Sequence, residues 1–120
     1  MATVNLTEQN FAQTLEKNEI VLVDFWASWC GPCRMFAPTY ETASKQHPDI
    51  LFGKVDTEAE QDLAAAAITS IPTLMALREG VLVFSQPGAL RPADLEQVIT
   101  GVKVLDMAEV RTKLEAQRGQ

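Results

Sequence analysis

The segment from Ile20 to Ala27 limits the possible folds of this chain more than any other, because seven of its eight residues are apolar. A short apolar run of this kind predicts a β-strand that other parts of the protein cover on both faces. Asp24 is the only charged residue in the run. Because side chains alternate between the two faces of a strand, Asp24 is expected on the same face as Leu22 and Trp26.

Strands and helices are predicted to alternate along most of the chain. Runs of apolar and β-branched residues predict further strands around Val4 and over residues 50–56, 73–77 and 81–84. Apolar residues at helical spacing predict helices over residues 8–17 and 62–67, from the cysteine pair at 30–33 to about residue 46, and from Pro92 onward. This order predicts an α/β protein with a central mixed sheet and helices on both of its faces.

The C-terminal part is predicted to contain one more helix. Gly101 is expected to end the helix that begins at Pro92, because glycine commonly follows the last helical turn. Asp106 then begins a new helix, with Glu109 completing a capping box. Three apolar residues at helical spacing form the stripe of this helix: Met107, Val110 and Leu114.

We therefore divide the chain into a domain of residues 1–105 and a helical extension of residues 106–120. A total of 120 residues is the usual size of a single domain. The apolar stripe of the extension is expected to pack onto that domain. The alternative is that the extension docks a partner protein.

The charge balance excludes several classes of function. Sixteen acidic and ten basic residues give a net charge of −6, and there is no basic stripe for binding nucleic acid. The acidic surplus also disfavours binding to anionic membranes. The first residues lack the pattern of a signal peptide, and no apolar run is long enough to span a bilayer. We expect a cytoplasmic protein that binds neither nucleic acid nor membranes.

The two cysteines of the chain follow the apolar strand in the sequence Cys30-Gly31-Pro32-Cys33. In a reducing cytosol, such a pair suggests redox chemistry or metal binding. By itself the pair also fits a structural role or half of a zinc site. Zinc sites as a rule need four ligands, and the chain adds only His47 to the two cysteines. We therefore expect no metal.

The spacing of the pair predicts different roles for the two thiols. The first cysteine of such a pair lies at a helix N-terminus, where unpaired N–H groups and the helix dipole stabilise a thiolate. Cys30 is therefore expected to attack a disulfide, and Cys33 to resolve the mixed disulfide. Gly31 allows another chain to approach, and Pro32 holds the backbone at the start of the helix. This rigid turn is expected to tune the redox potential towards the dithiol.

The sequence Trp29-Cys30-Gly31-Pro32-Cys33 resembles the active-site signature of thioredoxins. The resemblance covers about residues 4–102, with further matching motifs at 24–27, 34–38, 71–73 and 88–90. It implies the thioredoxin fold and the reduction of disulfides in client proteins. It also implies that no cofactor is bound and that electrons come from NADPH through a separate thioredoxin reductase. We expect the protein to act as a monomer.

The resemblance implies roles for two charged residues. Asp24 matches the aspartate that accepts the proton of the second cysteine while the mixed disulfide is resolved. This role agrees with the expectation that burial raises the pKa of an unpaired carboxyl group. Lys54 matches a lysine near the buried aspartate, whose positive charge tempers the pKa of that aspartate.

Four residues are implied to form a shallow apolar platform for clients: Trp29, Ile71, Pro72 and Gly88. Pro72 matches the cis-proline of the family, which lies beside the cysteine pair. It presents the backbone of Ile71 to an extended client peptide, which pairs as an added strand. Trp29 is expected to form an exposed apolar lip, and Gly88 to keep the third wall of the groove low.

Two other classes of function compete with a reductase. One is a binding module without enzymatic activity, but such modules often lack a cysteine or the proline, and this chain has both. The other is an oxidase or isomerase that forms or rearranges disulfides. Proteins of that class often have a polar or His-containing pair between the cysteines and act outside the cytosol.

Overall fold

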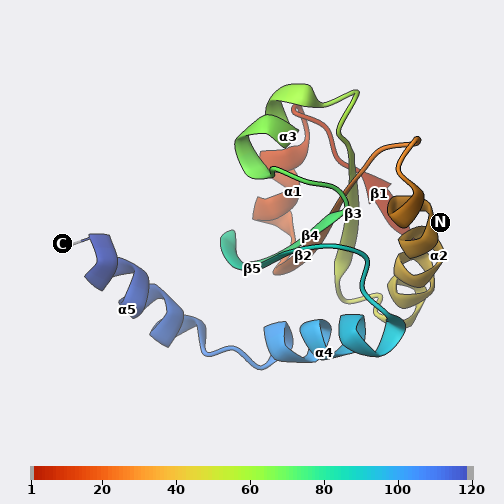
Figure 1. Ribbon diagram of the computed structural model, residues 1–120. Coiled ribbons are helices and arrows are strands. Elements are labelled where there is room, and N and C mark those ends of the chain that lie inside the picture. The colour runs from red at the N-terminus through yellow and green to blue at the C-terminus, as the bar shows by residue number, and fades with distance from the viewer. Residues whose placement is uncertain (1, 119–120) are drawn as a thin grey trace.

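β2 (Ile20–Trp26) is the central strand of a five-stranded sheet in the computed structural model, which describes residues 2–118 (Figure 1). The strands lie in the order β1-β3-β2-β4-β5 across the sheet. β2 runs parallel to β3 and antiparallel to β4, so the sheet is mixed. The other strands are β1 (Thr3–Asn5), β3 (Leu51–Asp56), β4 (Thr73–Arg78) and β5 (Val81–Pro87).

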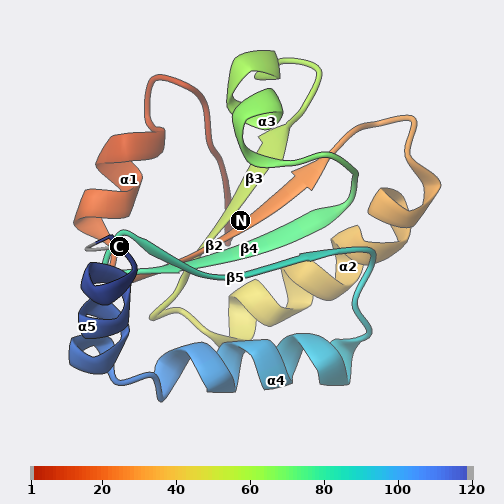
Figure 2. The ribbon, with the colours of Figure 1, turned by 60° about the vertical axis from the view of Figure 1, so that its left-hand side comes forward.

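Two pairs of helices cover the two faces of the sheet (Figure 2). α1 (Phe11–Lys17) and α3 (Gln61–Ala67) pack on one face. α2 (Gly31–Gln46) and α4 (Pro92–Lys103) pack on the other. Leu22 belongs to the core under α2 and α4, so the alternation along β2 directs Asp24 to the same side. The predicted α/β architecture, with a mixed sheet and helices on both faces, is confirmed.

The predicted elements are present, with ends that differ by a few residues. α1 begins at Phe11 rather than at residue 8, because Thr7 and Asn10 form a turn by exchanging hydrogen bonds between side chain and backbone. β5 continues to Pro87, since it pairs with β4 as far as Thr73. These ends depend on hydrogen bonds that the hydrophobic pattern does not contain.

Gly101 does not end α4, contrary to the prediction. The helix continues to Lys103, and Gly101 has an ordinary helical backbone rather than the positive φ of a helix-ending glycine. Arg78 of β4 defines the end of the helix instead. Its Nη1 atom donates hydrogen bonds to the carbonyl oxygens of Val102, Lys103 and Leu105, at 2.9, 3.0 and 2.8 Å.

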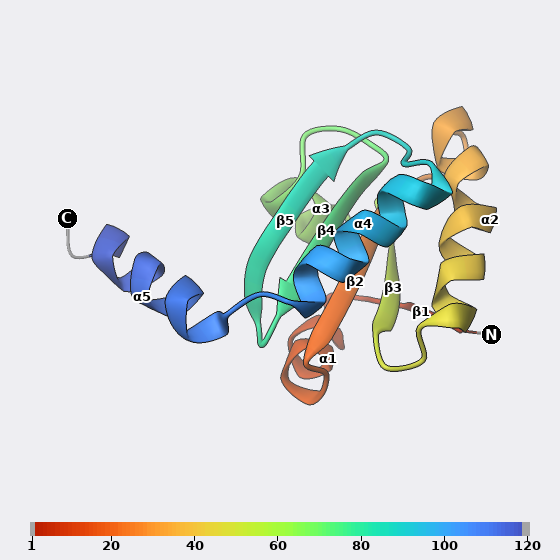
Figure 3. The same cartoon turned by 90° about the horizontal axis from the view of Figure 1, so that it is seen from below.

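The additional C-terminal helix is confirmed as α5 (Met107–Arg118), which leads away from the sheet (Figures 1 and 3). The backbone N–H of Glu109 donates to the carboxylate of Asp106 at 3.2 Å. The side chain of Glu109 pairs with Lys113 rather than reaching back to Asp106, so the predicted capping box is only half formed.

The predicted packing of the α5 stripe onto the domain is wrong for its outer part. Met107 is buried, Val110 is half-buried, and Leu114 is 37% exposed. A helix that points outward buries only the residues near its base. The extension was predicted to reach residue 120, and its last two residues lie outside the described part of the chain.

Candidate functional site

Cys30 and Cys33 form a disulfide bond at the start of α2, with their Cα atoms 5.2 Å apart. Cys30 is the N-cap residue of the helix, and its Sγ accepts a hydrogen bond from the backbone N–H of Cys33 at 3.3 Å. Pro32 lies in the first turn, where its missing N–H leaves no helical hydrogen bond unformed. The space around Gly31 is open. The redox pair is thus held within a single helical turn.

The disulfide has apolar surroundings. Ala27 forms a buried cluster with both cysteines, and Trp26 and Ile71 pack against this cluster. Cys30 is 5% exposed and Cys33 is 3% exposed, so burial hardly distinguishes the two residues. The difference between them lies in the helix terminus, whose N–H group is directed to Cys30.

Asp24 lies in the middle of β2 and is only 1% exposed. It is directly opposite Lys54 of β3 on one side and Leu74 of β4 on the other. Within residues 2–118, neither of its carboxylate oxygens has a hydrogen-bond partner. Burial raises the pKa of Asp24 to about 7, while the positive charge of Lys54 acts in the opposite direction. Asp24 can therefore gain or lose a proton near neutral pH.

The ammonium group of Lys54 lies over the ring of Trp26, 5.1 Å from the ring centre. A cation in this position is attracted to the electron-rich face of the ring. Because Trp26 also packs against the cysteine cluster, Lys54 is linked to the disulfide through one side chain. Sequence reasoning missed this contact, since it depends on how β3 pairs with β2.

The Ile71–Pro72 peptide bond is cis, and Ile71 packs against the cysteine cluster. The backbone N–H of Gly88 donates to the carbonyl oxygen of Pro72 at 2.8 Å. Gly88 has a φ of 101°, which residues with a side chain rarely adopt. The fold therefore places Ile71 against the cysteine cluster, and it joins Gly88 to Pro72, the next residue of the same segment.

Trp29 is 66% exposed and lies one residue before Cys30. It lines a shallow hollow of about 310 Å³ together with Ile71 and residues near α3. The residues near α3 are Thr57, Ala64, Ala65, Ile68, Thr69 and Ser70. Sequence reasoning did not assign these residues to the site. The run of small alanines from residue 64 is the signal that could have indicated an open surface there.

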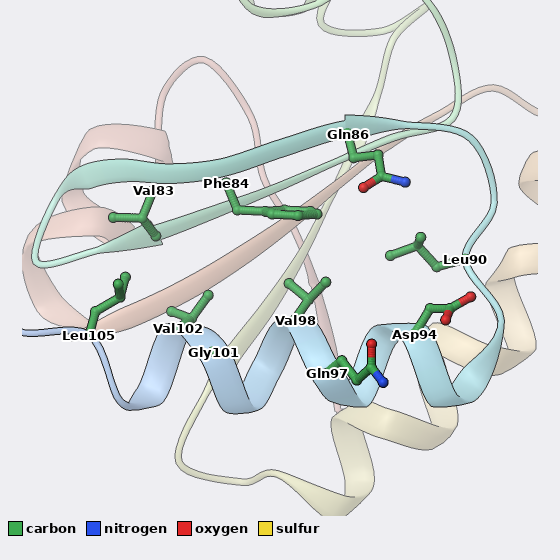
Figure 4. Close-up of a pocket in the computed structure, with 10 residues that line it drawn as sticks. All are labelled: Val83, Phe84, Gln86, Leu90, Asp94, Gln97, Val98, Gly101, Val102 and Leu105. Carbon is green, nitrogen blue, oxygen red and sulfur yellow. The ribbon is translucent and has the colours of Figure 1, made fainter.

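A larger hollow, of about 650 Å³, lies between β5 and α4 (Figure 4). Apolar side chains such as Phe84, Val98 and Leu105 form much of its lining. It contains neither cysteine and none of the residues around the disulfide. The smaller hollow is the one next to the redox pair, because its lining includes Trp29, which precedes Cys30, and Ile71, which packs against the cysteines.

The described residues offer no cluster of metal-binding side chains. Among residues 2–118, no three His, Cys, Asp or Glu side chains are grouped closely enough to hold a metal ion. His47 instead pairs with Glu96, at 2.9 Å. In the same part of the chain, no helix combines the length and the apolar character needed to cross a membrane.

The sequence has clear relatives. The sequence model of the family described as Thioredoxin matches residues 2–101. A protein of Streptomyces coelicolor described as putative thioredoxin 2 is 57% identical over 120 residues, covering 99% of this chain and 90% of that protein. The alignment with this relative extends through the region of α5, beyond the end of the family match.

Solved structures show the same fold. A thioredoxin of Plasmodium falciparum superposes with a TM-score of 0.75 at 36% identity, covering 81% of this chain and 96% of that structure. A mutant thioredoxin of Halobacterium salinarum superposes with a TM-score of 0.79 at 31% identity, covering 87% and 93% respectively. The fold is the thioredoxin fold, in which the cysteine pair itself is the redox group. With a family match over most of its length and that pair in place, this chain belongs to the thioredoxin family of protein-disulfide reductases.

Proposed function

We propose that the protein reduces client disulfides in two exchange steps, in which Cys30 attacks and Cys33 resolves. In the first step, the Cys30 thiolate forms a bond to one client sulfur, and the other client sulfur leaves as a thiolate. In the second step, the Cys33 sulfur attacks Cys30 Sγ, the mixed disulfide breaks, and the second client sulfur leaves. The client gains two electrons, and the protein ends as the Cys30–Cys33 disulfide.

The position of Cys30 at the N-cap of α2 is the observation that carries this order of attack. The N–H of Cys33, which donates to Cys30 Sγ in the disulfide, can donate to the Cys30 thiolate in the reduced protein. Unpaired N–H groups and the helix dipole lower the pKa of a thiol at this end of a helix. Cys30 is therefore the thiol that ionises first. The rigid Gly31-Pro32 turn holds the thiols together and tunes the pair towards donating electrons.

Asp24 acts as the general base that removes the proton from the Cys33 thiol in the second step. Its support is a pKa of about 7, because a carboxylate with this pKa is a stronger base than an exposed one, and about half of it is ionised at neutral pH. Lys54 limits the effect of burial, since its charge favours the ionised carboxylate. Without Lys54, the pKa of Asp24 would be higher still, and less of the carboxyl group would be ionised at neutral pH.

An extended client segment binds beside the disulfide and pairs with the backbone at Ile71. The exposed ring of Trp29 and the hollow that it shares with Ile71 accept apolar side chains of the client. Pro72 and Gly88 form the neighbouring wall, where the open space at Gly88 lets the client backbone approach. Main-chain pairing does not depend on the client's side chains, so this surface suits many different proteins.

The catalytic cycle takes place in the cytoplasm, where the protein acts as a monomer. A separate thioredoxin reductase returns the oxidised protein to the dithiol with electrons from NADPH, and the clients are proteins with accessible disulfides. The redox domain comprises residues 1–105, and residues 106–120 form an extension to it. The end of the family match at residue 101 supports this division.

A coupled assay tests the proposal. The protein is mixed with a disulfide-containing client, NADPH and a thioredoxin reductase, and the consumption of NADPH is followed. The wild type is expected to turn over, whereas Cys30→Ser and Cys33→Ser are expected to be inactive. Cys33→Ser should also accumulate a mixed disulfide with the client. Accumulation with Cys30→Ser instead would reverse the order of attack, and an inactive wild type would contradict the reductase cycle.

A further inference from the structure

Tyr40 is fully buried at the interface between α2 and the sheet. Its hydroxyl group donates a hydrogen bond to the carbonyl oxygen of Gly53 in β3, at 2.7 Å. Its ring lies between those of Phe36 and Phe52, with ring centres 5.5 and 5.2 Å away. The ring contacts stabilise the core in the usual way, but the hydrogen bond joins α2 to one defined point of the β3 backbone.

That point lies next to the charged residues of the site. Gly53 is opposite Val23 of β2, and the following pair across the same strands is Lys54 and Asp24. Cys33 and Tyr40 lie on the same helix, about two turns apart, and both are buried. The Tyr40 hydrogen bond therefore connects the helix that carries Cys33 to the strand residue that immediately precedes Lys54.

β3 is also held from its other face at the same place. The backbone N–H of Leu6 donates to the carbonyl oxygen of Lys54 at 2.8 Å. A Cβ atom at Gly53 would meet the side chain of Leu6, so that side chain occupies the space on this face. Gly53 and Lys54 are thus clamped between Leu6 on one side and Tyr40 on the other.

We propose that Tyr40 is a positioning residue for the resolution step: its hydrogen bond to Gly53 fixes the distance of the Lys54 charge and of α2 from Asp24. The inference rests on the proposed role of Asp24 as the base. It adds a residue whose hydroxyl group touches neither the client nor the cysteines.

The surroundings of Asp24 make its proton affinity sensitive to this distance. Lys54 from β3 is the charged group that acts on the pKa of Asp24. Tyr40 from α2 is uncharged, and its own pKa is raised by the charge of Asp24. The neighbouring residue on β4, Leu74, is apolar, and so are the buried residues of α4. With little other polarity nearby, the attraction between Lys54 and Asp24 changes strongly as their separation changes.

The hydroxyl group of Tyr40 is a dependable donor. Burial and the negative charge of Asp24 both raise the pKa of Tyr40 well above its usual range, so the hydroxyl keeps its proton. Loss of this group removes the tie between α2 and the β3 backbone, which remains paired with β1 and β2. The Lys54 charge then moves farther from Asp24 on average, which raises the pKa of Asp24 and misaligns Cys33 with its base.

The test compares three variants in the reduced full-length protein: Tyr40→Phe, Phe36→Leu and Asp24→Asn. Each is mixed with an oxidised peptide at concentrations high enough to make the first attack fast. The concentration-independent phase, which is resolution by Cys33, is followed by tryptophan fluorescence across a pH series. For Tyr40→Phe, we expect the pH midpoint of this phase to move up by several tenths of a unit and its plateau rate to fall several-fold.

Phe36→Leu is the matched control, because it removes a ring contact of Tyr40 and keeps the hydrogen bond to Gly53. It should lower the melting temperature without moving the pH midpoint. An unchanged midpoint in Tyr40→Phe, or an equal shift in Phe36→Leu, would overturn the proposal while leaving Asp24 as the base. If Asp24→Asn keeps the wild-type pH profile, the role of Asp24 fails, and the role of Tyr40 fails with it.

Discussion

Asp24 and Lys54 lie directly opposite each other on β2 and β3, yet the Lys54 ammonium lies over the ring of Trp26 rather than on the carboxylate. Within residues 2–118, no hydrogen bond reaches either oxygen of Asp24. The buried carboxyl group is therefore compensated only by a charge at a distance. This arrangement keeps Asp24 able to exchange a proton, and it makes the ionised form unfavourable for stability.

The stability of the oxidised protein should depend on pH through Asp24. Its pKa is about 7 in the folded protein, against 3.8 in the unfolded chain. Between these values the folded state binds more protons than the unfolded state, so stability falls as pH rises through this window. The difference between the two pKa values corresponds to a stability contribution of about 4 kcal/mol. This contribution is complete at acid pH and is fully lost above about pH 7. Urea unfolding at a series of pH values, compared for the wild type and Asp24→Asn, measures it.

The Asp24→Asn variant should lack this part of the pH dependence. It should gain stability relative to the wild type as the pH is raised from acid to mildly alkaline. Parallel pH profiles for the two proteins would show that Asp24 does not titrate in this range.

Removal of the Lys54 charge should shift the titration of Asp24 upward. In Lys54→Met, the attraction that favours the ionised carboxylate is lost, so the pKa of Asp24 rises above its present value of about 7. The resolution step should then need a more alkaline pH, as seen in its stopped-flow pH profile. Lys54→Arg keeps both the charge and the attraction to the Trp26 ring, and it is expected to stay close to the wild type. A shift of equal size in both variants would mean that shape rather than charge matters.

Arg78 should contribute more to stability than an exposed arginine. Its side chain is 14% exposed and donates to three carbonyl groups at the end of α4. Arg78→Met removes three hydrogen bonds at once, although the Val102 carbonyl keeps a backbone donor, and should lower the free energy of unfolding by about 3 kcal/mol. The control is Arg111→Ala, whose side chain is half exposed and pairs with Glu79. The free energy of unfolding should fall by less than about 1 kcal/mol in Arg111→Ala. A fall of equal size in both variants would contradict the role of Arg78 at the end of α4.

Two glycines should respond in opposite directions to alanine. Gly101 lies inside α4 with open space around it, so Gly101→Ala should stabilise the protein by about 0.5–1 kcal/mol. At Gly53, the new methyl group would collide with Leu6, and Gly53→Ala should destabilise by about 1–3 kcal/mol. Thermal unfolding should show a higher melting temperature for Gly101→Ala and a lower one for Gly53→Ala than for the wild type. Stabilisation by Gly53→Ala would show that Leu6 can move aside.

The sequence was sufficient for the features that depend on local pattern. An apolar run with one aspartate predicted a buried central strand. The spacing of Cys30 and Cys33 predicted a pair at a helix N-terminus, and the family resemblance identified it as the redox pair. Each of these features involves neighbours in the chain, and side-chain alternation or helical periodicity describes them. The site residues distant from the pair, such as Ile71 and Gly88, came from the family resemblance, because no local pattern connects them to it.

Local pattern failed where the outcome depends on distant partners. Gly101 was expected to end its helix, but Arg78 of another element binds the carbonyls that decide where α4 ends. Leu114 was expected to be buried, but α5 points away from the domain. Helical periodicity indicates which residues share a face, and it does not indicate whether that face has a partner.

The sequence by itself thus determined that a buried aspartate, Asp24, a cysteine pair and the helix that follows this pair belong to one α/β domain. Only the tertiary structure decided what surrounds the acid. Lys54 over Trp26, and Tyr40 on the carbonyl of Gly53, both depend on how β3 pairs with β2 and how α2 packs on the sheet. The physical reason is that electrostatic interactions act through space, so the proton affinity of Asp24 depends on neighbours that are remote in the chain.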